Sequence, residues 1–167
     1  MAGREDAGAG AGKPVFRGVT HLALDAKGRL AIPAKHRPAL VGASPGNGEE
    51  GTLVLTADPS RCLLLYPLAE WEPIQARLMG LSSFNETIRS LQRLIVGHAD
   101  DVEMDAAGRI LVPPSLRQYA GLEHRVVLVG QGSKFELWDE NRWLEQTARA
   151  IAFPAQGLPS ELDGFSL

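Results

Sequence analysis

Apolar and polar residues alternate along two short segments near the start of the chain, residues 15–24 and 29–32. The apolar positions of one parity are Leu22, Leu24, Leu30 and Ile32. This period of two predicts a half-buried β-hairpin with these side chains on its inner face. The connecting Asp25-Ala26-Lys27-Gly28 suits a type I turn closed by a left-handed glycine, which puts a bulge in the hairpin.

The same pattern returns 80 residues later. Residues 24–37 align without a gap with residues 104–117, and six of the fourteen positions are identical. Residues 63–66 and 135–138 also match, each followed by a tryptophan, at an offset shortened by an extra loop of about residues 41–51 in the first copy. The chain is therefore a tandem repeat. Two copies are too few for a solenoid and suit a pseudo-symmetric pair with a shared core.

Each copy is expected to continue with two more strands and a helix, which makes the fold α+β and β-rich. The additional strands are predicted at residues 52–56, 62–66, 125–129 and 134–138. Pro33 and Pro113 end the preceding strands and can begin short helices, and Gly121 is placed to end the second of these. Asp139 is expected to cap the last helix.

A helical connector is predicted between the copies. Ser83-Phe84-Asn85-Glu86 fits a capping box at its start. An apolar stripe at helical spacing follows, formed by Ile88, Leu91, Leu94 and Ile95. Such a stripe is expected to pack in the core or in an interface.

These patterns divide the chain into five parts. We expect a disordered N-terminal extension at residues 1–14, a first module at 15–80, the connector at 81–99, a second module at 100–153 and a flexible C-terminal tail at 154–167.

Charge is unevenly distributed along a chain whose net charge is -3. Residues 13–40 hold six Lys or Arg against one acidic residue, whereas residues 41–72 hold five acidic residues against one arginine. This indicates either one functional basic face on an acidic body or an ordinary solvated charge run. Besides Arg29, the basic residues that such a face would offer to a polyanion such as a nucleic acid are Lys13, Arg17, Lys27 and Lys35.

Arg29 and Arg109 are the repeated residues that turn geometry does not require. They have the opposite parity to Leu30 and Ile110, so they project away from the core at the base of each hairpin. A guanidinium held there by a nearby carboxylate suits a phosphate or the edge of guanine. The alternative is a structural Asp–Arg pair that only fixes the turn. Asp25, Gly28, Asp105 and Gly108 would support the motif in either case.

The sequence argues against an enzyme and against a metal or cofactor site. The Gly-rich stretch before Lys13 lacks the spacing of a phosphate loop, and Pro14 replaces the required Ser or Thr. The four histidines have no metal-ligand spacing, and Cys62, the single cysteine, is expected to be a buried thiol. There is no secretory signal and no apolar run of about 18 residues, so we expect a cytoplasmic protein.

At these residues the sequence resembles the MraZ family. Matching stretches include Phe16-Arg17-Gly18, Cys62 to Pro67, Leu94 to Ala99 and Lys134 to Trp138. The double Asp-x-x-x-Arg motif of that family falls on Asp25/Arg29 and Asp105/Arg109, and both copies are intact.

The resemblance implies a fold, a function and an assembly. The fold is two AbrB-like swapped-hairpin modules forming a pseudo-symmetric β-barrel with flanking helices. The function is transcriptional regulation of the division and cell wall gene cluster, through binding of double-stranded DNA at short direct repeats in the protein's own promoter region. Arg29 and Arg109 are the DNA-binding arginines. The assembly is a ring-shaped homo-oligomer, with an octamer expected, associated with the nucleoid.

The chain departs from the family pattern in two places. The second copy has Ala107 and Ser115 where the first has Lys27 and Lys35, so we expect the first copy to dominate DNA affinity. Residues 1–14 precede the usual start, and because some valine codons serve as starts, we hypothesise that they are a misassigned leader before Val15. The alternative function is a ring-shaped scaffold that binds a protein partner.

Overall fold

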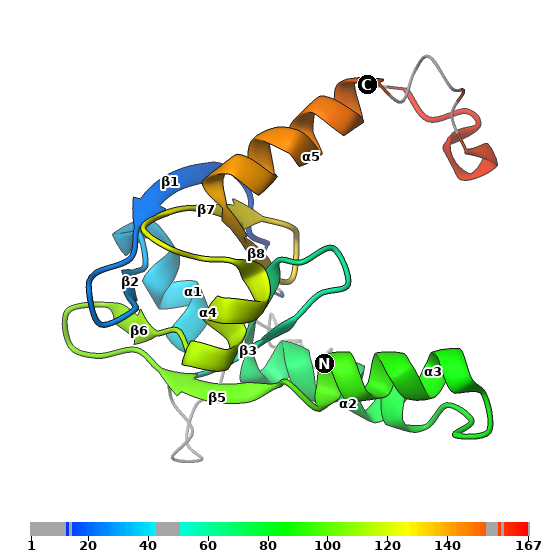
Figure 1. Cartoon of the computed structure of the whole chain (residues 1–167), viewed down its shortest axis with the longest axis horizontal. Helices are drawn as coiled ribbons and strands as arrows, with labels where there is room; N and C mark the ends of the chain where they lie inside the picture. The colour runs from blue at the N-terminus through cyan, green and yellow to red at the C-terminus, as the bar shows by residue number, and fades with distance from the viewer. Residues whose placement is uncertain (1–12, 14, 43–50, 153–156, 158, 167) are drawn as a thin grey trace, which may run out of the picture.

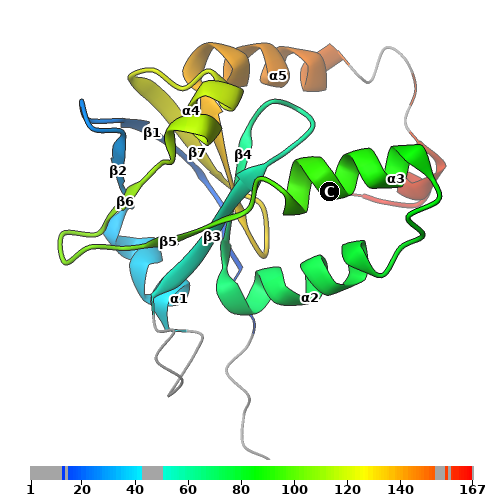
Figure 2. The ribbon, with the colours of Figure 1, turned by 60° about the horizontal axis from the view of Figure 1, so that its bottom comes forward.

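Two copies of one strand arrangement build a single antiparallel sheet (Figures 1 and 2). The structure is a computed structural model that describes residues 13, 15–42, 51–152, 157 and 159–166. The strands of the sheet, in spatial order, are β1 (Val19–Ala23), β7 (Arg125–Gly130), β8 (Phe135–Asp139), β4 (Leu63–Pro67), β3 (Thr52–Ala57) and β5 (Asp100–Glu103). A separate two-stranded ribbon pairs β2 (Arg29–Ala31) with β6 (Arg109–Leu111).

The two copies exchange their first strands. β1 of the first copy pairs with β7 of the second, and β5 of the second pairs with β3 of the first. The register is symmetric about the middle: Leu63 lies opposite Leu137 across β4 and β8, and Leu30 lies opposite Ile110 across β2 and β6. This exchange confirms the predicted pseudo-symmetric pair with a common core.

The strands in the described part of the chain form an open sheet, not a closed barrel. β1 and β5 are its two edges. The predicted fold class, α+β and rich in β-structure, is confirmed, whereas the predicted pseudo-barrel is not.

Helices flank the sheet. They are α1 (Arg37–Val41), α2 (Leu68–Met79), α3 (Glu86–Leu91), α4 (Pro114–Ala120) and α5 (Glu140–Ala152), with a short 3₁₀ helix η1 (Ala34–His36) before α1 and a π-helical segment η2 (Gln92–Val96) after α3. A final 3₁₀ turn spans Ser160–Leu162. None of the described helices has the length and apolar content needed to cross a membrane.

Most of the predicted helix ends are confirmed, and one is wrong. Gly121 ends α4 in the left-handed region at φ 64°, and Asp139 Oδ2 accepts a hydrogen bond from the Arg142 amide at 3.2 Å. The capping box beginning at Ser83 is not formed. Instead Asn85 Oδ1 accepts from the Ile88 amide at 3.1 Å, because α3 begins at Glu86, three residues after the predicted cap.

The core joins apolar residues from both copies. Leu24, Leu30 and Ile32 of the first hairpin are at most 2% exposed, and Ile110 and Val112 of the second are 1% exposed. Burying each such side chain contributes about 1.5–3 kcal/mol, so the hairpins are held by packing as well as by backbone pairing. The predicted burial of Leu24, Leu30 and Ile32 is therefore confirmed, and Leu22 is half-buried against the same core. The predicted pairing of residues 15–24 with 29–32 is wrong, because β1 pairs with β7 and β2 with β6 across the two copies.

Parts of three predicted segments lie outside the described residues. They are nearly all of the N-terminal extension, at 1–12 and 14, most of the extra loop of the first copy, at 43–50, and part of the C-terminal tail, at 154–156, 158 and 167. The assignment of residues 1–14 as an extension stays a prediction.

Candidate nucleic-acid interface

The first hairpin turn, residues 25–28, is shaped by one carboxylate and one glycine. The Asp25 amide donates to the Arg29 carbonyl at 3.0 Å, and the Gly28 amide donates to the Asp25 carbonyl at 3.0 Å. Asp25 Oδ1 accepts from the amides of Lys27 and Arg29, both at 2.9 Å. Gly28 has φ 81°, a conformation that a residue with a Cβ rarely adopts. This is the predicted type I turn with a glycine bulge.

The second hairpin turn, residues 105–108, repeats these contacts. The Asp105 amide donates to the Arg109 carbonyl and the Gly108 amide to the Asp105 carbonyl, both at 2.9 Å. Asp105 Oδ1 accepts from the amides of Ala107 and Arg109, and Gly108 has φ 77°. The motif Asp and Gly positions are thus accounted for by backbone geometry in both copies.

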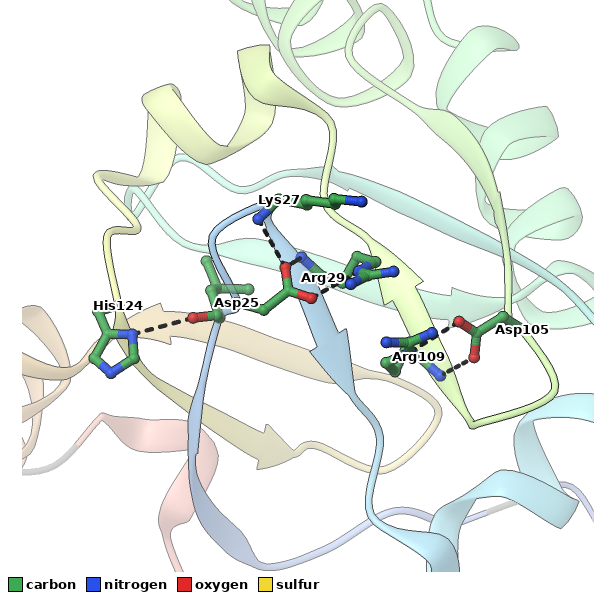
Figure 3. Close-up of polar contacts among 7 residues, drawn as sticks. Asp25, Lys27, Arg29, Asp105, Arg109 and His124 are labelled. Atoms are coloured by element: carbon green, nitrogen blue, oxygen red, sulfur yellow. Dashed lines mark hydrogen bonds and ion pairs between the residues drawn. The ribbon is translucent and has the colours of Figure 1, made fainter.

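Each motif arginine is paired with the aspartate of its own turn (Figure 3). Arg29 Nε donates to Asp25 Oδ2 at 2.7 Å, and Arg109 Nε donates to Asp105 Oδ2 at 2.9 Å. The side chains of Arg29 and Arg109 remain 33% and 38% exposed. Each arginine donates to its aspartate through Nε alone. Its terminal Nη groups have no hydrogen-bond partner among the residues that the structure describes.

The aspartates are held in their ionised form. The backbone hydrogen bond from the Arg29 amide, followed by the Arg29 side chain, lowers the pKa of Asp25 below its usual 3.8. The pKa of Asp105 is lowered in the same way by Arg109. Both carboxylates are therefore charged at neutral pH and keep their arginines oriented.

The β2/β6 ribbon brings the two arginines to one surface. Arg29 lies opposite Leu111 and Arg109 lies opposite Ala31, so the arginines are diagonal neighbours across the ribbon. Leu30 and Ile110 point the other way and are buried. Two half-exposed guanidiniums, each attached to its own carboxylate, thus lie close together on the outer face (Figure 3).

Two further arginines support the turns and were missed from the sequence. Arg117, in α4 of the second copy, lies against Gly28, and Arg37, in α1 of the first copy, lies against Gly108. Arg37 Nε also donates to the Ile32 carbonyl at 2.8 Å. A signal was available, because Arg37 and Arg117 are identical positions of the repeat. The sequence does not show which turn each arginine contacts. Each contacts the turn of the other copy, because the copies exchange strands.

The other candidate lysines and arginine are exposed but are not all brought to the ribbon. Lys27 is in the first turn itself. Arg17 follows Phe16, which pairs with Gly132, and this places it at the end of β1 far from the turn. Lys13 is exposed and precedes this segment, and Lys35 is exposed in η1, beyond β2. The structure therefore assembles Lys27, Arg29 and Arg109 with their two aspartates, and leaves Lys13, Arg17 and Lys35 outside this group.

The single cysteine lies in a buried cluster. Cys62 is fully buried, and burial raises the pKa of its thiol well above the usual range, so the predicted buried thiol is confirmed. Within the described ranges no group of three or more His, Cys, Asp or Glu could hold a metal ion.

Comparison with known proteins identifies the family. A family model described as MraZ protein, putative antitoxin-like, matches residues 15–94 and again 95–164. The transcriptional regulator MraZ of Nitrosospira multiformis is 59% identical over 153 residues, which is 92% of this chain and the whole of that protein. The proteins of the same name from Thiobacillus denitrificans and Halorhodospira halophila are 56% and 49% identical with the same coverage. These relatives are named as regulators and not as enzymes, in agreement with the sequence prediction. The chain belongs to the MraZ family.

Proposed function

We propose that this protein is a transcriptional regulator that binds double-stranded DNA with the outer face of the β2/β6 ribbon. One observation carries the proposal: Arg29 and Arg109 each use Nε on their own aspartate, so each presents its two Nη groups outward. A guanidinium oriented in this way can donate two parallel hydrogen bonds to a phosphate or to guanine O6 and N7. The relatives' shared name supports the role in transcription.

The target that we propose is a set of short direct repeats in the protein's own promoter region, within the division and cell wall gene cluster. The resemblance to the family suggests this target. Binding there would place the protein on the nucleoid.

A homo-oligomer would supply the affinity that one chain of net charge -3 lacks. Linked weak sites gain roughly 10²–10⁴-fold in avidity when they engage one DNA molecule together. We propose a ring, of eight subunits by the resemblance, that places successive ribbons on repeats spaced by about one helical turn, or 10–10.5 base pairs.

Two apolar surfaces are candidates for the contacts between neighbouring subunits. They are the exposed Leu144 and Ile151 of α5, and a cavity of about 410 Å³ between α2 and η2 that is lined by Trp71, Ile74 and Ile95.

Gel shifts with the upstream DNA test the proposal. Arg29→Ala should abolish binding at concentrations that shift DNA with the wild-type protein, because a bidentate arginine contact contributes about 1–3 kcal/mol in every ribbon that engages. Arg109→Ala should cost less, since its turn carries Ala107 in place of Lys27. Arg89→Ala removes an exposed arginine from α3 and is the charge-matched control.

The salt dependence separates phosphate contacts from base contacts. Each phosphate contact contributes about 0.9 to the slope of log affinity against log salt. Lys27→Ala should flatten that slope by about one and weaken all DNA sequences alike. Unchanged affinity in Arg29→Ala would refute the proposed role of that residue. If the wild-type protein shifts no upstream DNA even at low salt, the ring-shaped scaffold for a protein partner becomes the better explanation.

A further inference from the structure

A third turn in the protein has the geometry of the two hairpin turns but carries an arginine where they carry glycine. Between β3 and β4, the Asp58 amide donates to the Cys62 carbonyl and the Arg61 amide to the Asp58 carbonyl, both at 3.0 Å. Asp58 Oδ2 accepts from the Ser60 amide at 2.8 Å. Arg61 has φ 66° and is the one non-glycine residue in the described part of the chain with a positive φ. Glycine would fit this position without strain, so the geometry of the turn does not account for an arginine here.

The guanidinium of Arg61 is held in place by α4. It lies over the ring of Tyr119, 5.6 Å from the centroid, and Nη1 is 3.5 Å from the Tyr119 carbonyl oxygen. Tyr119 Oη donates in turn to the Asp58 carbonyl at 2.7 Å. Stacking on the ring face leaves the edge of the guanidinium available to a ligand.

Arg61 also borders a cavity of about 510 Å³ whose charged lining residues are mostly cationic. The cavity lies between the β3–β4 turn and α5, and Trp138 contributes to its wall. One side of α5 faces it with Arg142, Glu145 and Arg149. The lining therefore has three arginines against one glutamate, in a chain whose net charge is -3. Among the described residues none of the three arginines is in an ion pair.

The repeat shows that the shared fold does not require this cluster. The helix α2 of the first copy corresponds to α5, and it has Glu70 and Arg77 where α5 has Arg142 and Arg149. The β7–β8 turn has Gly132, at φ 76°, as its left-handed residue. Only one of the three arginines thus has a counterpart, although both copies form the same strands and helix.

We infer that this cavity binds a small phosphorylated molecule that carries at least two phosphate groups, with Arg61, Arg142 and Arg149 as its ligands. The volume lies within the range of about 300–1,000 Å³ that is typical of small-molecule sites. A guanidinium can bind two phosphate oxygens at once. Three guanidiniums carry more positive charge than a ligand with a single carboxylate would neutralise. The cavity is distinct from the proposed DNA face, because the β3–β4 turn and α5 lie on the side of the molecule away from the hairpin turns in both views (Figures 1 and 2).

Calorimetric titration of the full chain with inorganic triphosphate at low salt tests the inference. We expect one site per chain, and at least a tenfold loss of affinity in Arg61→Gly and in Arg149→Gln. Arg61→Gly should fold at least as stably as the wild type because glycine suits the turn, so a loss of binding cannot be attributed to unfolding. Arg77→Gln, the change at the counterpart of Arg149, is the matched control and should leave the affinity unchanged.

Three results would overturn the inference. One is no binding of triphosphate by the wild-type protein, and another is equal binding by the wild type and Arg61→Gly. The third is binding that is lost in Arg29→Ala/Arg109→Ala and not in Arg61→Gly, which would place the anion on the hairpins. Because the titration contains no DNA, its failure leaves the proposed DNA binding untouched.

Discussion

Replacing Gly28 by alanine tests how tightly the hairpin turns are held by the opposite copy. Gly28 has φ 81°, and a left-handed conformation costs a residue with a Cβ roughly 1–2 kcal/mol. A methyl group at this position would also overlap Nη1 of Arg117, so that side chain has to move. This displacement adds about 1 kcal/mol, at the lower end of the usual cost of overpacking. At about 2–4 °C per kcal/mol for a chain of this size, Tm should fall by roughly 4–12 °C.

Gly132→Ala is the matched control. Gly132 has φ 76°, and a Cβ there would have no atom within 4 Å, so the substitution carries only the backbone strain. Equilibrium unfolding in guanidinium chloride, at one fixed protein concentration, measures both variants. The excess cost of Gly28→Ala over Gly132→Ala should disappear when both are compared in an Arg117→Ala background. Equal costs in the wild-type background would show that Arg117 does not support this turn.

Three other measurements test the core, the partly buried His36 and the motif aspartate. Leu30→Ala should lower the free energy of unfolding by about 2–5 kcal/mol, because Leu30 is fully buried opposite Ile110; near wild-type stability in a denaturant titration would contradict the central position of this pair. Burial, with a smaller effect of Lys35, lowers the pKa of His36 below its usual 6.5, so the folded state resists protonation. Stability should therefore be full above pH 6.5 and fall as the pH drops toward the folded pKa, and His36→Phe should flatten that fall in a series of thermal melts. The Asp25 carboxyl should titrate below 3.8 by ¹³C NMR, and Arg29→Ala should raise its pKa only in part, because the amide of residue 29 still donates to it; a full return to 3.8 would assign the effect to the side chain instead.

The strands and turns could be predicted because their signals are local. Alternation at Leu22, Leu24, Leu30 and Ile32 reflects a pleated strand with one buried face, and the observed burial follows it. The Asp-x-x-Gly spacing specifies a turn whose hydrogen bonds span only four residues. The capping box failed because Ser83 and Asn85 can both cap a helix, and tertiary packing decides where α3 begins.

The spatial arrangement of the site could not be derived from these local signals. Parity predicts that Arg29 and Arg109 face outward, but their position as diagonal neighbours depends on the pairing of β2 with β6, which joins residues 80 apart. The same exchange places Arg117 on the turn of the other copy. The family resemblance implied a swapped hairpin, but only the coordinates give the register. Arg17 is near the motif in sequence but precedes β1, at the end of that strand away from the turn, so proximity in sequence did not give proximity in space; its role in DNA binding stays a prediction.

The exchange of first strands also determines when this protein can fold during synthesis. Val19 pairs with Val129, so β1 leaves the ribosome more than a hundred residues before its partner strand exists. At about 5–20 residues per second this strand waits roughly 5–20 s with its backbone groups unpaired. The first half of the polypeptide therefore cannot complete its part of the sheet alone, and a nascent chain stalled between the copies would expose the edge that β7 later covers.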